Sequence, residues 1–106
     1  NKNVIDMTGK VSFHETCYLV SKSVYVLSAD TGVIHVADLL SCKGGLLLGP
    51  TAFGRTTSKS IKVFEKNLDC RPCSKDGRGK CSQKVYQKCM VDIGPEVVAE
   101  HIESCL

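Results

Sequence analysis

Four of the seven cysteines in this chain of 106 residues lie in one basic stretch, and their spacing could support three kinds of chemistry. Clustered thiols cross-link a loop-rich chain, hold a metal ion or carry out redox reactions. The clustered residues are Cys70, Cys73, Cys81 and Cys89, and the others are Cys17, Cys42 and Cys105. The choice among these uses determines the compartment of the protein and thereby limits its function.

Disulfide bonds are the first interpretation of the cluster. Residues 67–83 carry no hydrophobic periodicity, and Pro72, Gly77 and Gly79 discourage regular structure, so this stretch needs another means of support. A bridge that closes about 15 residues contributes about 3 kcal/mol by restricting the unfolded chain. We therefore expect about three disulfides. Their pairing stays open, and the seventh cysteine is either free or bonded outside this chain.

A structural zinc ion is the alternative interpretation, in two versions. The four clustered cysteines follow the pattern C-x2-C-x7-C-x7-C, which offers four thiolates for the tetrahedral site that zinc prefers. The second version combines Cys70 and Cys73 with His101 and Cys105, because the last two share one face of a helix. Zinc would then be the cofactor, and the basic loop would contact nucleic-acid phosphates. The disulfide interpretation needs no cofactor.

Thiol redox chemistry is the third interpretation, because residues 70–73 have the C-x-x-C form. Such a motif opens a helix whose N-terminus lowers the pKa of the first thiol. Here the sequence SKDGRGK follows, and the alternating strands and helices of a βαβ fold are not predicted. We therefore expect no enzyme activity, and a C-x-x-C oxidoreductase is the enzymatic alternative.

Positive charge is concentrated where the cysteines are. Residues 55–88 carry ten basic and three acidic side chains, a net charge of +7, against zero for residues 1–54 and −4 for residues 89–106. Such a block either keeps a loop solvated or forms a docking surface for a polyanion or an acidic protein face. The candidate contact residues in the basic loop (71–88) are Arg71, Lys75, Arg78, Lys80, Lys84 and Lys88.

Other catalytic patterns are missing from the sequence. His14-Glu15 lacks the second histidine of HExxH, and the glycines of GGLLLG match neither phosphate-binding pattern. No serine lies in a G-x-S-x-G elbow. His35, inside VIHVA, is interpreted as an ordinary strand histidine. The sequence therefore predicts no catalytic residue.

The first half of the chain is predicted to be β-structure. Residues 11–20 mix β-branched and aromatic side chains, which is typical of a strand. Residues 23–27 and 33–37 flank the turn at 29–32, and this pattern predicts a β-hairpin. Residues 46–48 are predicted to form a short buried strand after the Gly44-Gly45 break.

The second half of the chain is predicted to hold two further strands and a helix. Residues 60–64 alternate as SIKVF, which indicates a half-solvated strand, and residues 84–93 return to strand character. The end is predicted to be helical, with Gly94 at the N-cap and Pro95 at the first helical position. Its apolar face consists of Val98, Ile102 and Cys105.

Length and composition favour a single domain over residues 1–106, cut from a larger protein. With 42% hydrophobic and 24% charged residues the chain can bury a modest core, and no apolar run reaches the roughly 18 residues of a membrane span. The predicted fold is α+β, mainly β: a small disulfide-stapled domain with a C-terminal helix.

The predicted function is that of a non-enzymatic, cysteine-rich structural or recognition module of a secreted, cell-surface or viral envelope glycoprotein. Such a module would lie outside the cell or on the virion surface, attached to its parent chain, with a protein or polyanionic partner on the basic loop. The alternative function is an intracellular zinc-stabilised nucleic-acid-binding domain.

Overall fold

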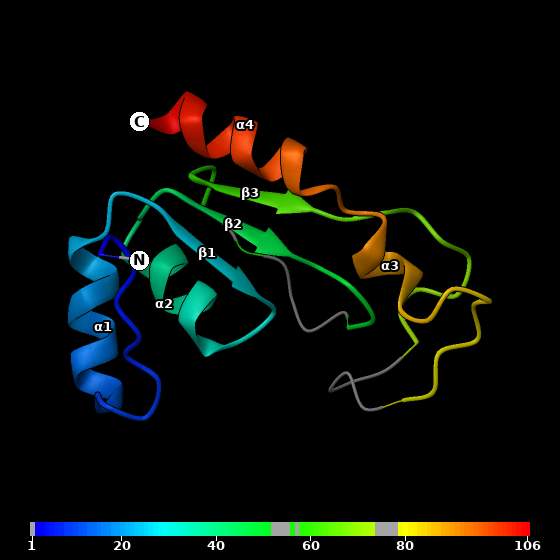
Figure 1. Ribbon diagram of the computed structural model, residues 1–106, viewed down its shortest axis with the longest axis horizontal. Coiled ribbons are helices and arrows are strands. Elements are labelled where there is room, and N and C mark those ends of the chain that lie inside the picture. Colours follow the sequence, from blue (N-terminus) through cyan, green and yellow to red (C-terminus); the bar gives the residue numbers. More distant parts are fainter. Residues whose placement is uncertain (1, 52–55, 57, 74–78) are drawn as a thin grey trace.

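The computed structural model describes residues 2–51, 56, 58–73 and 79–106, which form a parallel sheet with helices on both faces (Figure 1). The elements are α1 (Phe13–Lys22), β1 (Val26–Ala29), α2 (Gly32–Leu39), β2 (Gly44–Leu47), β3 (Ile61–Phe64), α3 (Lys88–Val91) and α4 (Pro95–Cys105). The three strands lie in the order β1-β2-β3, and both neighbouring pairs are parallel. The fold is therefore α/β, and the predicted α+β, mainly β, fold is wrong.

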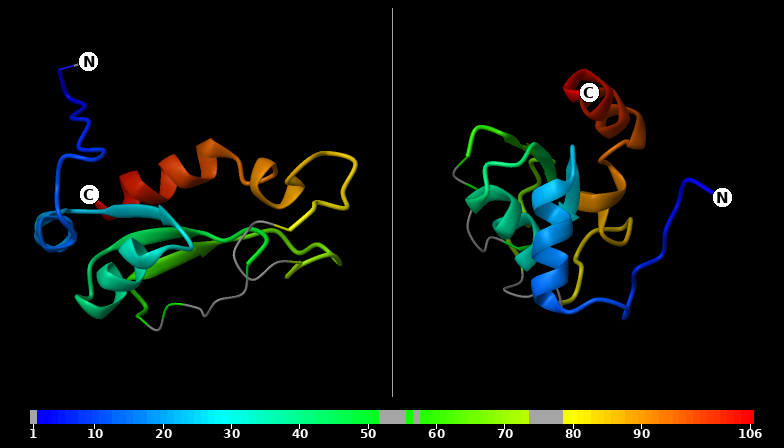
Figure 2. Two further views of the ribbon diagram at one scale, coloured as in Figure 1. Left: turned by 90° about the horizontal axis from the view of Figure 1, so that it is seen from below. Right: turned by 90° about the vertical axis from the view of Figure 1, so that its left-hand side faces the viewer.

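Helix α2 covers one face of the sheet and α4 lies on the opposite face (Figure 2). The main core lies between α2 and the sheet, where Ile34 of α2 and Leu46 of β2 are completely buried. Ala37, one helical turn after Ile34, is also completely buried, and Val20 of α1 joins the same cluster. Burial of this apolar stripe supplies the main force that holds the crossover helix on the sheet.

The predicted hairpin at 23–37 is wrong, because its second half is helix α2. Strand β1 pairs with β2 in parallel, and parallel neighbours require a crossover rather than a tight turn. The segment Asp30–Gly32, predicted as a turn, instead leads from the end of β1 into the first turn of α2. The β-branched residues of VIHVA fit a helix here because positions 34 and 37 face the core together.

The predicted strand at 11–20 is also wrong, since most of it is helix α1. Ser12 is the N-cap: its hydroxyl accepts a hydrogen bond from the Glu15 N–H, and the Glu15 carboxylate accepts one from the Ser12 N–H. These paired bonds form a capping box, whose sequence signature is Ser-x-x-Glu. They hold the pKa of Glu15 below its usual value, because N–H and hydroxyl donors stabilise the carboxylate.

The short strands predicted at 46–48 and 60–64 correspond to β2 and β3, although β2 begins earlier, at Gly44. The strand predicted at 84–93 is wrong, because these residues form a loop and the four-residue helix α3. The terminal helix is confirmed, with Gly94 as N-cap and Pro95 as its first residue.

Helix α4 is attached to the sheet by a polar contact as well as by Val98, the buried residue of its apolar face. The Tyr25 hydroxyl lies 2.9 Å from Nδ1 of His101, and the Phe64 ring packs edge-on against the same imidazole. Burial raises the pKa of the Tyr25 phenol. The terminal helix therefore packs against the start of β1 and the end of β3.

The predicted disulfide staples are absent. All seven cysteines lie in the described part of the chain, and all are free thiols. The fold is held instead by the sheet and by the packing of α2 and α4 on its two faces. Among the described residues, no helix is both long and apolar enough to span a bilayer.

The closest packing in the sheet yields a test of the fold. A Cβ on Gly44 would lie 2.5 Å from the backbone oxygen of Val26, which cannot move away without displacing β1. We expect Gly44→Ala to lower the free energy of unfolding by about 1–3 kcal/mol, as overpacking does. Urea unfolding of the full-length protein, followed by circular dichroism, measures this loss.

Gly32→Ala is the matched control, because no described atom lies within 4 Å of the position of its added Cβ. Its free energy of unfolding should stay within about 0.5 kcal/mol of the parent. Equal losses in the two variants would contradict the close contact of β2 with β1.

Candidate functional site

A polar site lies where the carboxyl ends of β1 and β2 meet. Asp30 follows β1 directly, and Gly49–Thr51 follow β2. Because the two strands are parallel neighbours, their carboxyl ends lie at the same edge of the sheet. Ligands of open parallel sheets bind in the crevice outside this edge.

The centre of this site is the Asp30 carboxylate. Its Oδ2 accepts a hydrogen bond of 2.6 Å from the Thr51 hydroxyl, and its Oδ1 lies 3.2 Å from Nε2 of His35. The Asp30 side chain is 6% exposed, whereas the His35 side chain is 40% exposed. A buried, fixed carboxylate thus orients an accessible imidazole, which can donate to an anion or accept a proton.

Helix α2 begins beside these groups, with Thr31 as its N-cap. Its N-cap Thr31 makes no side-chain capping bond, and the first turn, which the structure describes in full, holds no acidic residue. The Thr31 hydroxyl lies 3.0 Å from that of Ser28. No described atom lies within 4 Å of the Cβ position of Gly32, so a ligand can approach the backbone closely. Free N–H groups at a helix N-terminus bind anions such as phosphate.

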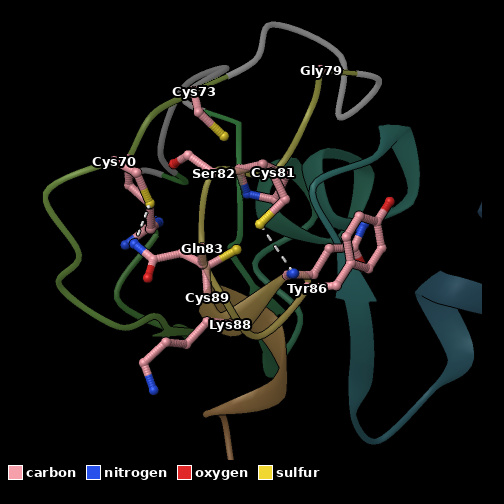
Figure 3. Close-up of a pocket in the computed structure, with 12 residues that line it drawn as sticks. Cys70, Cys73, Gly79, Cys81, Ser82, Gln83, Tyr86, Lys88 and Cys89 are labelled. Atoms are coloured by element: carbon pink, nitrogen blue, oxygen red, sulfur yellow. Dashed lines mark hydrogen bonds between the residues drawn. The ribbon is translucent and has the colours of Figure 1, made fainter.

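A pocket, here called the thiol pocket, is lined in part by Pro50, the residue before Thr51. Its lining includes all four clustered cysteines, Cys70, Cys73, Cys81 and Cys89 (Figure 3). The Gln83 amide donates to the Cys70 sulfur at 3.3 Å, and the Gln87 N–H donates to the Cys81 sulfur at 3.2 Å. Backbone N–H donors lower the pKa of Cys81, whereas burial raises that of Cys89.

Arg71 fastens the thiol pocket to the polar site. Its guanidinium donates from Nε to the Gly49 oxygen at 2.7 Å and from Nη1 to the Lys66 oxygen. Nη2 pairs with Glu65 at 3.3 Å, and the Arg71 side chain is only 10% exposed. The next cysteine continues the attachment, because the Cys73 N–H donates to the Pro50 oxygen at 3.0 Å. The segment after β2 therefore contacts both sites.

Comparison with known proteins identifies this architecture. The sequence pattern of the family described as "Glycosyltransferase family 9 (heptosyltransferase)" matches residues 1–86, which include the whole polar site. The chain belongs to glycosyltransferase family 9. The prediction of a non-enzymatic module is therefore wrong, and so is its alternative, a zinc-stabilised nucleic-acid-binding domain.

This family 9 chain is similar to two curated proteins named lipooligosaccharide heptosyltransferase 2, from Campylobacter jejuni subsp. jejuni serotypes O:6 and O:2. Each is 27% identical to the chain, over 97% and 100% of it, but over only 32% and 33% of the relatives. The chain thus spans about a third of the length of these relatives. No solved structure matches it.

Membership in family 9 also corrects the predicted location. Family 9 heptosyltransferases are bacterial enzymes of the cytoplasm and its inner membrane, so a secreted, cell-surface or virion-surface module is excluded. The predicted disulfides fail for the same reason, because a reducing compartment keeps structural thiols unpaired.

The basic residues expected to form a docking surface fall into different settings. Arg71 uses its donors on main-chain oxygens and Glu65, and Lys88 pairs with Asp92 at 2.7 Å. Lys80 and Lys84 are exposed. Lys75 and Arg78 lie outside the described residues. That these residues contact a polyanion or an acidic protein face stays a prediction.

The two zinc arrangements expected from spacing also differ in outcome. His101 and Cys105 lie on α4, where His101 bonds to Tyr25, and neither lines the thiol pocket. The structure therefore does not bring these two residues together with Cys70 and Cys73. Among the described residues, no group of three or more His, Cys, Asp or Glu side chains is arranged to hold a metal ion as it stands.

Sequence reasoning missed the residues of the polar site. Asp30 and Gly32 were assigned to a hairpin turn and His35 to a strand, so their meeting with Thr51 was not expected. A signal was present: an apolar strand, Asp-Thr-Gly and then VIHVA can begin a helix at the end of a parallel strand. The strong β-propensity of Val33–Val36 concealed it.

The attachment by Arg71 can be tested with a charge-conserving change. Arg71→Lys keeps the positive charge but loses the planar fork that bonds two main-chain oxygens at once. We expect the Cys73 amide to exchange with deuterium at least about tenfold faster, since about 1.4 kcal/mol of local hydrogen bonding is lost. Mass spectrometry of the peptide over 68–73 measures this rate.

Lys80→Ala serves as the control, because it removes an exposed charge from the same loop without touching the Gly49–Pro50 segment. An unchanged exchange rate in Arg71→Lys, equal to that in the control, would show that Arg71 does not hold the two segments together.

Proposed function

We propose that this chain forms the donor-binding part of a heptosyltransferase that acts in the assembly of bacterial lipooligosaccharide. The observation that carries the proposal is the Asp30–His35–Thr51 constellation at the N-terminus of α2, inside the segment that matches family 9. The names of the curated relatives support the choice of sugar and acceptor.

The donor would be a heptose activated through a phosphate group, because the polar site suits an anion. The open first turn of α2 offers backbone N–H groups and the positive end of the helix dipole. Gly32 leaves room for a phosphate to reach them. As the bond from the anomeric carbon to the phosphate oxygen breaks, negative charge builds on that phosphate, and this helix end stabilises it.

His35 and Asp30 would act on the same phosphate. The exposed imidazole can donate a hydrogen bond to a phosphate oxygen, and the Asp30 carboxylate, 3.2 Å from Nε2, holds the ring in place. Thr51 fixes the carboxylate from the end of β2. The acceptor hydroxyl attacks the anomeric carbon and gives its proton to a general base.

Removing the charge of Asp30 should impair transfer without unfolding the protein. Asp30→Asn keeps the size of the side chain but withdraws the charge that orients His35, so we expect kcat/KM for heptosyl transfer to lipooligosaccharide to fall at least tenfold, about 1.4 kcal/mol. Thr51→Val should give a smaller loss in the same direction. Both are measured by steady-state kinetics on the full-length enzyme.

Glu103→Gln is the matched control, because it neutralises an exposed carboxylate on α4, far from the polar site in sequence and on the other face of the sheet. Its kinetics should equal those of the parent. Full transfer activity in Asp30→Asn, with normal folding by circular dichroism, would refute the role given to this site.

A further inference from the structure

The thiol pocket is not used by the proposed transfer reaction, yet it gathers four cysteines from two separate segments. Cys70 and Cys73 come from the loop after β3, and Cys81 and Cys89 come from the loop and helix that follow (Figure 3). Among the described residues of the stretch 65–87, which leave out 74–78, there is no strand. Something besides a hydrogen-bond ladder must therefore order this region.

The compartment decides between the uses of these thiols. Stable disulfides belong to oxidising compartments, and clustered cysteines in an intracellular enzyme more often bind a metal. All four thiols are free in the structure, and membership in family 9 places the chain in a reducing compartment. A metal site therefore explains the cluster better than cross-links do.

We propose that Cys70, Cys73, Cys81 and Cys89 bind one structural zinc ion. Cysteine sulfurs at C-x2-C spacing are common ligands of structural zinc, and a site with four of them satisfies its tetrahedral coordination. The space inside the pocket is about 20 Å³, enough for one water-sized occupant. An iron–sulfur cluster also takes four cysteines, and metal analysis distinguishes it from a single zinc ion.

Zinc binding must draw the four sulfurs together. Among the described residues, no three ligand side chains are already arranged to hold the same metal ion. Such closure is the usual behaviour of structural zinc sites, in which metal binding and local folding are one event. The bonds of Arg71 and of the Cys73 N–H hold Cys70 and Cys73 on the segment after β2, so closure would bring Cys81 and Cys89 toward them.

Zinc binding would place negative charge among basic side chains of the pocket. Four thiols release four protons on binding, so the zinc and its ligands carry a net charge of −2. Arg71 and Lys88 both line the pocket, but each is already paired, with Glu65 and Asp92, so they offset only part of this charge.

Metal analysis of the full-length protein, purified with a reductant and without chelators, tests the proposal. We expect about one zinc per chain, and cobalt substituted for it should show the sulfur-to-metal absorption of a tetrahedral thiolate site. Cys73→Ser and Cys81→Ser, one from each segment, should each lower zinc affinity at least tenfold. Should either variant fail to fold, blocking the parent's thiols with a mercurial must release the zinc as four thiols react.

Cys17→Ser and Cys105→Ser are the matched controls, since neither residue lines the pocket, and both should keep one zinc per chain. Protein without metal whose seven thiols all react freely would overturn the proposal. Bound iron with sulfide in place of zinc would also overturn it. So would an intact mass that lies below that of the reduced protein and rises when a reductant is added, because this difference marks a disulfide. None of these readouts depends on heptosyl transfer, so the proposed function can fail or stand separately.

Discussion

The parallel pairing of β1 with β2 is the constraint on which the rest of the structure depends. The register sets Val26 beside Gly44 and Ala29 beside Leu47, so both strands end at the same edge. A parallel pair cannot be closed by a turn, and the chain must cross the sheet as α2. The buried stripe of that helix then fixes its N-terminus beside Asp30, which follows β1. The polar site is thus a consequence of topology more than of local sequence.

The parts of the fold that could be predicted are those whose signals are local. The alternation of SIKVF predicts strand β3, and Gly-Pro followed by an acidic residue predicts the start of helix α4. The parts that could not are α1 and α2, where β-branched and aromatic residues suggested strands. Their helical form is decided by the capping box at Ser12 and by burial of Ile34 against the sheet. Tertiary context overrides β-propensity in such segments.

The candidate site was hidden for a related reason. Asp30 and Thr51 are 21 residues apart in the chain and meet only because two parallel strands end together. Without that pairing, Asp30 is one residue of a turn and His35 one residue of a strand. The cysteines posed the opposite difficulty: their clustering was evident, but spacing alone does not reveal the redox state of the compartment, which came from the family.

The short segment after β2 links the two regions of the molecule. Gly49 accepts the hydrogen bond from Arg71, and the backbone oxygen of Pro50 accepts that from Cys73. A Cβ on Gly49 would lie 2.4 Å from the Met90 sulfur and 3.4 Å from the Cys89 sulfur, so a side chain there would force the Met90 side chain to move. Thr51, which holds Asp30, comes two residues later. Order in the thiol pocket therefore bears directly on the backbone that positions the Asp30 carboxylate, and a metal bound there would stiffen the polar site without touching its ligand.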